Sequence, residues 1–254
     1  MKDLTVIVPI DKFNDEVSSL LSNALNSVES GTKILLVGPE STLAPIKSLD
    51  CVKSKDVDYV ENDNINLPTQ INKAVDATTT KYFSVLEYDD EFTKCWFKNV
   101  QERIESEPNA FAYLPINEVF SYNDKDEAIG YANEPVWASS FSEKLGYFDT
   151  ESLENYVDIA CSGGLFDREA FLEIGGLKES IKVSFWYELM LRADYKSKKI
   201  YVVPKVGYRH GIERPGSLLE IYKQTLTSDE ATWWINLAKQ EHFFKKDRNK
   251  TYQK

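Results

Sequence analysis

The sequence has too few cysteines for a disulfide framework and lacks any long apolar run. Its three cysteines, Cys51, Cys95 and Cys161, are far apart, odd in number and without the spacing of a zinc site. No run approaches the roughly 18 apolar residues that a membrane span requires. The first residues also lack the apolar core and the small-residue cleavage site of a signal peptide. We therefore expect a protein of the reducing cytoplasm with no membrane span.

Positive charge is also scarce. Lys and Arg number 30 against 41 Asp and Glu, which gives a net charge of −11. This balance argues against a protein that wraps nucleic acid, and an acidic substrate would need a metal ion or local basic residues to neutralise it. We expect the basic residues near the end of the chain to form a solvated surface, and they would bind a phosphate-rich acceptor such as DNA only if they converge. They are Lys239, Lys245, Lys246, Arg248 and Lys250.

The first third of the chain alternates short apolar runs with segments of helical periodicity. In a chain of 254 residues, 42% of them hydrophobic, this pattern predicts a large α/β domain with right-handed crossovers and a mostly parallel sheet. The expected strands are Leu4–Ile10, Lys33–Val37, Val57–Val60 and Tyr82–Leu86, and the expected helices are Asp15–Glu29 and Leu67–Ala77.

The rest of the chain mixes further strands and helices with one long aromatic-rich segment. We expect residues Gly130 to Tyr156 to form a loop over the sheet that holds substrate. The expected helices are Trp96–Ile104, Tyr187–Tyr195 and Ser228–Phe244, the expected extended segments are Phe111–Phe120, Lys199–Val203 and Pro204–His210, and Leu165–Ile174 is expected to hold a strand end and a short helix.

Three carboxylates follow the apolar run Tyr82–Leu86. Ligands of open α/β sheets bind at the carboxyl ends of the strands, where Glu87, Asp89 and Asp90 would lie. Glu87 and Asp89 are two residues apart and would point to one side, so a divalent cation could bridge them to a phosphate. The alternative is a solvated strand end in which Asp90 caps the next helix.

The order of these segments resembles that of family 2 glycosyltransferases of the GT-A fold. The resemblance extends from about Leu4 to Gly211 and defines a GT-A-like domain over residues 1–211, with a C-terminal helical extension over residues 212–254. The matching segments are Leu4–Ile10, Asn72 and Ala77 before Tyr82-Phe83, Leu86–Asp90, Phe166–Gly176, Tyr187–Arg192 and Tyr208–His210.

The resemblance implies an inverting transfer of a sugar from a nucleoside-diphosphate sugar to a hydroxyl acceptor, with Mn²⁺ or Mg²⁺ as cofactor. The acceptor could be a glycan, a protein, a small molecule or a modified nucleic acid. The implied metal ligands are Glu87, Asp89, Asp90 and His210. The implied donor site comprises Pro9, Ile10, Asp11, Glu40, Asn72, Glu87 and Arg209, and the implied acceptor side comprises Gly163, Gly164 and Trp186.

The sequence departs from the family pattern at three places. The second strand runs into Gly38-Pro39-Glu40, where the family has aspartates that contact the base. Glu87 replaces the first aspartate of the metal motif. Phe185-Trp186 stands where the family has the acidic pair that supplies the catalytic base, which leaves Glu188 as the nearby carboxylate.

Four of these residues have a structural interpretation beside the functional one. Glu188 is either the base or the partner of Arg192 at the i, i+4 spacing of a helix. His210 either completes the metal shell or is structural. Arg209 either contacts a diphosphate or is a surface charge, and Trp186 either stacks on a sugar or packs in the core, which we favour.

Two hypotheses for function follow. The first is a metal-dependent glycosyltransferase in which Glu188 is the candidate base. The second is a GT-A domain that has lost its chemistry at Phe185-Trp186 and serves as a binding or assembly module. A nucleotidyltransferase is disfavoured because no Gly-rich, basic loop follows the first strand.

Overall fold

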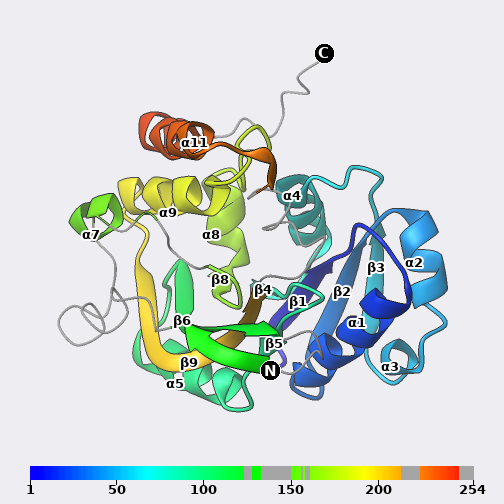
Figure 1. Ribbon diagram of the computed structural model, residues 1–254. Helices are drawn as coiled ribbons and strands as arrows, with labels where there is room; N and C mark the ends of the chain where they lie inside the picture. Colours follow the sequence, from blue (N-terminus) through cyan, green and yellow to red (C-terminus); the bar gives the residue numbers. More distant parts are fainter. Residues whose placement is uncertain (123–127, 133–149, 156, 158–160, 213–223, 246–254) are drawn as a thin grey trace.

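A computed structural model describes residues 1–122, 128–132, 150–155, 157, 161–212 and 224–245. Within these residues the strands form a nine-stranded mixed sheet in the order β3-β2-β1-β4-β8-β6-β9-β5, with β7 paired to β6. Helices cover the sheet on both faces (Figure 1). This architecture confirms the predicted GT-A-like α/β fold.

The first four strands are parallel, as predicted. They are β1 (Leu4–Pro9), β2 (Lys33–Gly38), β3 (Val57–Glu61) and β4 (Tyr82–Val85), with β1 between β2 and β4. Between them lie α1 (Asp15–Ser27) and α4 (Leu67–Ala77), which the helical periodicity predicted, and the short helices α2 (Glu40–Ile46) and α3 (Asp50–Lys53), which it did not.

The remaining strands extend the sheet beyond β4. They are β8 (Leu165–Asp167), β6 (Ala112–Tyr122), β9 (Ile200–Ile212), β5 (Glu91–Phe92) and β7 (Ala128–Ala132). Strand β8 is antiparallel to β4 and β6, whereas β9 is parallel to β6. The two extended segments predicted around Pro204 form one strand, because β6 and β9 shift register on either side of Ile116 and stay paired past the proline.

Two apolar cores lie on opposite faces of the sheet, because successive strand residues alternate between them. On one face Val6, Val8 and Ile34 pack with Val17 and Leu21 of α1. The other face carries the second core, in which Ile7, Leu35 and Phe83 of the sheet pack with Ile71 and Val75 of α4.

The other helices are α5 (Trp96–Ser106), α7 (Thr150–Asn155), α8 (Arg168–Glu173), α9 (Phe185–Tyr195) and α11 (Ser228–Glu241). Helix α11 lies on the outside of α9 (Figure 1), where the Ser184 hydroxyl donates to the Trp234 carbonyl at 2.7 Å and Ala238 is fully buried. A capping box formed by Thr227 and Glu230 starts this helix at the predicted residue Ser228, and the helix ends at Glu241, before the predicted Phe244.

The loop predicted between Gly130 and Tyr156 is wrong at both ends, because residues 130–132 belong to β7 and Thr150–Asn155 form α7, and residues 133–149 lie outside the described residues. The basic residues Lys246, Arg248 and Lys250 also lie outside them. Among the helices that are described, none combines the length and the apolar character needed to cross a bilayer.

Candidate active site

The carboxylates after β4 lie on a tight turn rather than on a continuing strand. The Asp90 amide donates to the Glu87 carbonyl at 3.1 Å, which closes a four-residue turn. The turn brings residues i and i+3 together, so the neighbour of Glu87 is Asp90 and not Asp89 as strand alternation predicted. Asp89 is partly exposed and lies outside the group of potential metal ligands described next.

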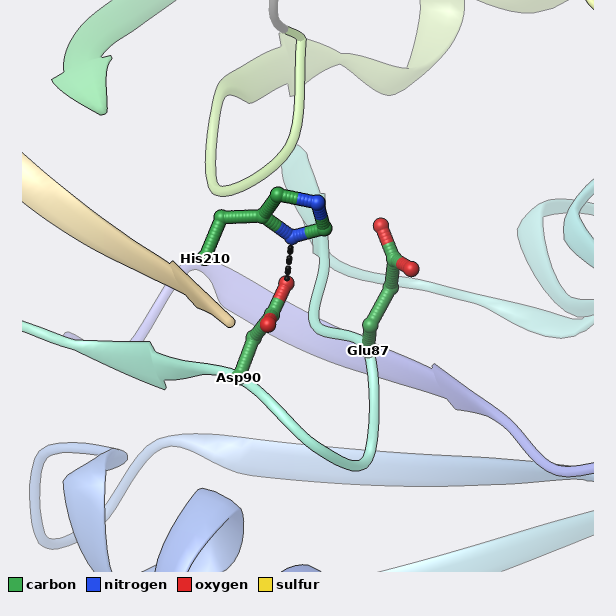
Figure 2. Close-up of side chains that lie close together, drawn as sticks. All are labelled: Glu87, Asp90 and His210. Atoms are coloured by element: carbon green, nitrogen blue, oxygen red, sulfur yellow. Dashed lines mark hydrogen bonds and ion pairs between the residues drawn. The ribbon is translucent and has the colours of Figure 1, made fainter. Parts of the chain in front are cut away.

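Glu87, Asp90 and His210 form a compact group at the carboxyl end of β4. Each residue offers one potential ligand atom, and these three atoms all lie within 4.8 Å of one another. His210 comes from β9 and meets Asp90, with His210 Nδ1 and Asp90 Oδ2 2.7 Å apart. Figure 2 shows the Glu87 carboxylate beside the imidazole ring, one nitrogen of which is hydrogen-bonded to Asp90. The structure thus brings together three of the four predicted metal ligands.

Asp90 orients His210. Its two carboxylate oxygens are both engaged, one with His210 Nδ1 and the other with the Gly211 amide at 3.0 Å, and the residue is 1% exposed. A carboxylate that holds one imidazole nitrogen leaves the other nitrogen, Nε2, as a metal ligand. Glu87 oxygens and His210 Nε2 are therefore the ligands that this geometry offers, with Asp90 behind the imidazole.

Two hydroxyl groups fix the position of Glu87. The Tyr208 hydroxyl accepts from the Glu87 amide at 3.1 Å, and the Ser162 hydroxyl donates to Glu87 Oε1 at 3.2 Å. Tyr208 is fully buried, and burial raises the pKa of its hydroxyl well above the ordinary value. These two residues were not predicted from the sequence, because their partners are 121 and 75 positions away.

The electrostatics of the group favour a cation. Burial raises the pKa of Glu87 to about 7, and the negative charge of Asp90 adds to this effect. For His210, burial acts to lower the pKa, but the hydrogen bond and the charge of Asp90 prevail and raise it to about 9. Both shifts have the direction that clustered negative charge produces, and a bound cation would offset that charge. Carboxylate oxygens suit Mg²⁺ and Mn²⁺ and an imidazole nitrogen suits transition metals, so the group could hold a divalent metal.

Gly163 lies next to Tyr208 and the end of β4, whereas a Cβ on Gly164 would meet Leu114 and Phe166. The Gly163 amide donates to the Val85 carbonyl, the last residue of β4, at 3.2 Å. A Cβ on Gly163 would lie 2.3 Å from the Tyr208 ring, and the residue has φ of +73°. The glycine therefore lets the Tyr208 ring lie directly beneath the Glu87–Asp90 turn.

Gly163→Ala is expected to lower the free energy of unfolding by about 2–4 kcal/mol, because it combines a left-handed backbone with a clash. The matched control is Gly31→Ala, which has φ of +78° and no atom within 4 Å of its Cβ. That variant is expected to lose about 1 kcal/mol. Urea unfolding of both variants measures the difference, and equal losses would show that the Tyr208 ring does not require a glycine.

The predicted donor residues at the ends of β1 and β2 lie at the same edge of the sheet as the turn. The Ile10 amide donates to the Val37 carbonyl at 2.8 Å, so Pro9, Ile10 and Asp11 leave β1 beside the end of β2. Glu40 starts α2 at this edge and hydrogen-bonds to Glu61 at the end of β3. This hydrogen bond lowers the pKa of Glu40 and raises that of Glu61. Glu61 was not predicted as part of this carboxylate pair.

Glu188 is paired with two cationic side chains. Its side chain is fully buried, and both carboxylate oxygens contact Arg192, with Oε2 2.6 Å from Nη2 and Oε1 2.9 Å from Nε. Lys178 Nζ lies 3.0 Å from the same Oε1. These contacts support the structural interpretation, a helix pair at i, i+4, and the catalytic role of Glu188 stays a prediction.

Three further predicted site residues make structural contacts instead. The Asn72 side chain donates to the Leu177 carbonyl at 2.9 Å and accepts from the Leu177 amide at 2.8 Å. Trp186 stacks on Phe166 with centroids 5.1 Å apart, as favoured from the sequence. Arg209 lies next to His210 on β9 and so points to the other face of the sheet.

On that face Arg209 forms an ion pair with Glu118 at 2.7 Å. It also lines a hollow of about 680 Å³ between α1 and β5, together with Asn23, Asn26 and Lys94. The structure does not bring it together with Glu87, Asp90 and His210.

The fold agrees with comparisons to known proteins. The chain resembles two crystal structures of S. aureus TarS residues 1–349, one of them in complex with UDP. The TM-scores are 0.59 and, for the UDP complex, 0.60, at 16% identity in both cases. The matches cover 83% and 94% of this chain but 60% and 65% of the TarS chains, so this chain spans less than two thirds of their length.

A comparison with curated proteins finds no significant match. The family model described as glycosyl transferase family 2 matches residues 6–175, which include most of β1, all of β2 to β4, the Glu87–Asp90 turn and Gly163. The chain therefore belongs to glycosyl transferase family 2.

Proposed function

We propose that this protein is a divalent-metal-dependent, inverting glycosyltransferase that moves a sugar from a nucleoside-diphosphate sugar to a hydroxyl acceptor. The observation that carries the proposal is the Glu87, Asp90 and His210 group, placed at the carboxyl end of β4 in a chain of this family. Ligands of open α/β sheets bind at this edge.

Each residue of the group has a role in this proposal. Glu87 and His210 Nε2 would hold Mn²⁺ or Mg²⁺. Asp89, which was also predicted as a ligand, lies on the same turn as Glu87. The cation, when bound, supplies positive charge to the leaving diphosphate. Asp90 keeps the imidazole oriented, and the hydroxyls of Ser162 and Tyr208 keep Glu87 in place.

The nucleoside would lie over the ends of β1, β2 and β3. Pro9, Ile10 and Asp11 border this region, and the Glu40 and Glu61 carboxylates at its far end could accept hydrogen bonds from a base or a ribose. The UDP complex of the structurally similar TarS supports uridine diphosphate as the first nucleotide to test.

A second candidate function is a nucleotide-binding module without catalysis. Two observations favour it. Phe185-Trp186 occupies the position of the family's acidic pair, and the nearby Glu188 is enclosed by Arg192 and Lys178. In an inverting transfer a general base takes the proton of the acceptor hydroxyl. An enzyme would need Glu188 in that role or a base from another residue.

The two functions are separated by measuring binding and turnover on the same samples. Nucleoside diphosphates and their sugar conjugates are titrated calorimetrically with and without Mn²⁺, and release of the nucleoside diphosphate is then followed with a panel of hydroxyl acceptors. The variant Glu87→Gln serves as the metal-site control. Metal-dependent binding with release supports the transferase, and binding without release for any acceptor supports the module. The absence of nucleotide binding under every metal condition would contradict both.

A further inference from the structure

Most of the large exposed apolar side chains in the described part of the chain lie on or beside two helices that contact each other, α9 and α11. Large hydrophobic residues with substantial exposure number six in the described part of the chain, and five of them lie on or beside α9 and α11. Only Ile65 lies elsewhere among them. The five are Val183, Tyr195, Trp233, Phe243 and Phe244, with exposed fractions of 38%, 54%, 55%, 45% and 66%. Clustering of this kind marks an interaction surface rather than scattered apolar exposure.

The outward face of α11 carries no charge along its central part. Trp233, Asn236 and Gln240 are exposed and follow the spacing of one helix face, and all three are uncharged. The opposite side of the helix contacts α9, with Ala238 buried. Figure 1 shows α11 as the outermost layer at this side of the molecule. Helix α11 thus presents an uncharged ridge with Trp233 near its start.

An aromatic cluster extends this ridge beyond the end of α11. Tyr195 and Phe243 have ring centroids 5.7 Å apart, and the Phe243 and Phe244 centroids are 6.0 Å apart. His242 lies against both Tyr195 and Phe243, with centroids 5.7 and 4.3 Å away. These rings contact one another and remain exposed, so they form a continuous apolar surface.

Basic residues border the aromatic cluster. Lys196 Nζ lies 5.0 Å from the centroid of the Tyr195 ring, and Lys245 directly follows Phe244. Lys198 lies nearby and is paired with Glu173 at 2.5 Å. Acidic residues lie at both ends of the ridge. Asp229 and Glu230 lie at its start, where the Glu230 carboxylate caps the helix at Thr227, and Asp194 and Glu241 directly precede Tyr195 and His242 of the aromatic cluster. The sequence from Lys245 to Lys254 has five basic residues and one acidic residue, in a protein of net charge −11.

We propose that the outward face of α11 and the aromatic cluster at its end dock on an anionic lipid surface. Aromatic side chains insert at the boundary between headgroups and acyl chains, and neighbouring lysines are attracted to anionic headgroups. The charge of the sequence favours anionic lipid as the occupant, because the five basic residues and one acidic residue of residues 245–254 directly follow the aromatic cluster and would be attracted to anionic headgroups. The helix would lie in the plane of the interface, with Trp233 and Phe244 buried.

The test is co-sedimentation of the full chain with vesicles of phosphatidylcholine alone and of an equimolar phosphatidylcholine–phosphatidylglycerol mixture. We expect binding to the anionic vesicles that weakens as salt is added, because the lysine contribution is screened. The double variant Phe243→Ser, Phe244→Ser is expected to bind the anionic vesicles at least about tenfold more weakly than wild type. The control Ile65→Ser removes a residue that is 58% exposed on another surface and should bind as wild type.

A second pair of variants tests the electrostatic part. Lys196→Glu with Lys245→Glu should abolish the preference for anionic vesicles, whereas Lys98→Glu, at a side chain 80% exposed on α5, should not. Brominated lipids should quench the tryptophan fluorescence of wild type, and much less that of Trp233→Phe. None of these positions belongs to the candidate active site, so UDP and Mn²⁺ binding should be unchanged in all variants.

Two results would overturn the proposal. One is equal recovery of wild type and the double phenylalanine variant with anionic vesicles. The other is a doubled molecular mass in solution that the same variant abolishes, without vesicle binding, which would assign the surface to a second copy of the chain.

Discussion

Arg192→Met is expected to lower the free energy of unfolding by about 3–5 kcal/mol. Arg192 and Glu188 are both fully buried and share two hydrogen bonds, and Arg192 Nη1 also donates to the Ile174 carbonyl at 2.7 Å. Removing the arginine leaves the Glu188 carboxylate in the interior with Lys178 as its only remaining cationic partner among the contacts described above. Urea denaturation of the purified variant measures the loss.

The matched control removes all three charges. The triple variant Lys178→Met, Glu188→Leu, Arg192→Met replaces the buried ions by apolar groups of similar size, and we expect it to be within about 2 kcal/mol of wild type. If the single and triple variants lose stability equally, the interpretation of Glu188 as a buried charge stabilised by Arg192 and Lys178 is wrong. The triple variant also tests the catalytic role first predicted for Glu188, because a stable triple variant with unchanged transfer excludes it as the base.

His210→Ala is expected to weaken Mn²⁺ binding by more than about 100-fold. The variant removes the nitrogen ligand and leaves Asp90, 1% exposed, without the imidazole at 2.7 Å. The same loss should appear in the metal-dependent part of UDP binding, because the cation joins the protein to the diphosphate in the proposed site. Isothermal titration of Mn²⁺, with and without UDP, measures both effects.

Two variants accompany this measurement. Asp90→Asn keeps the shape of the orienting residue and should weaken Mn²⁺ binding less, by about 10- to 100-fold. His242→Ala removes the other histidine, which packs with Tyr195 at the end of α11, and should bind Mn²⁺ as wild type does. Unchanged Mn²⁺ affinity in His210→Ala would remove His210 from the proposed site.

The parallel half of the fold could be predicted because its signals are local. Runs such as Lys33–Val37 and the periodicity of Leu67–Ala77 encode a buried strand and an amphipathic helix without reference to the rest of the chain. The antiparallel half depends on distant pairing. β5 has only the two residues Glu91 and Phe92, which pair with Arg209 and Tyr208 of β9. No periodicity can show a strand of that length.

The location of the candidate site could be predicted from a local signal, but the contacts between its residues could not. A run of carboxylates after a buried strand identified the location, but strand alternation selected Glu87 with Asp89, and the turn selects Glu87 with Asp90. For Glu188 the i, i+4 spacing to Arg192 was visible, and only burial distinguishes an internal ion pair from a base. The amide of Asn72 is paired with Leu177, 105 positions away, which no local pattern reveals.

The most direct test of the metal site is pulsed electron paramagnetic resonance of Mn²⁺ bound to the protein with UDP. We expect modulation from an imidazole ¹⁴N in wild type and in His242→Ala, and its loss in His210→Ala. We also expect Glu87→Gln to reduce the amount of bound Mn²⁺ while folding is preserved. Mn²⁺ that binds without nitrogen modulation, or with modulation that survives in His210→Ala, would contradict a metal centre built from Glu87 and His210.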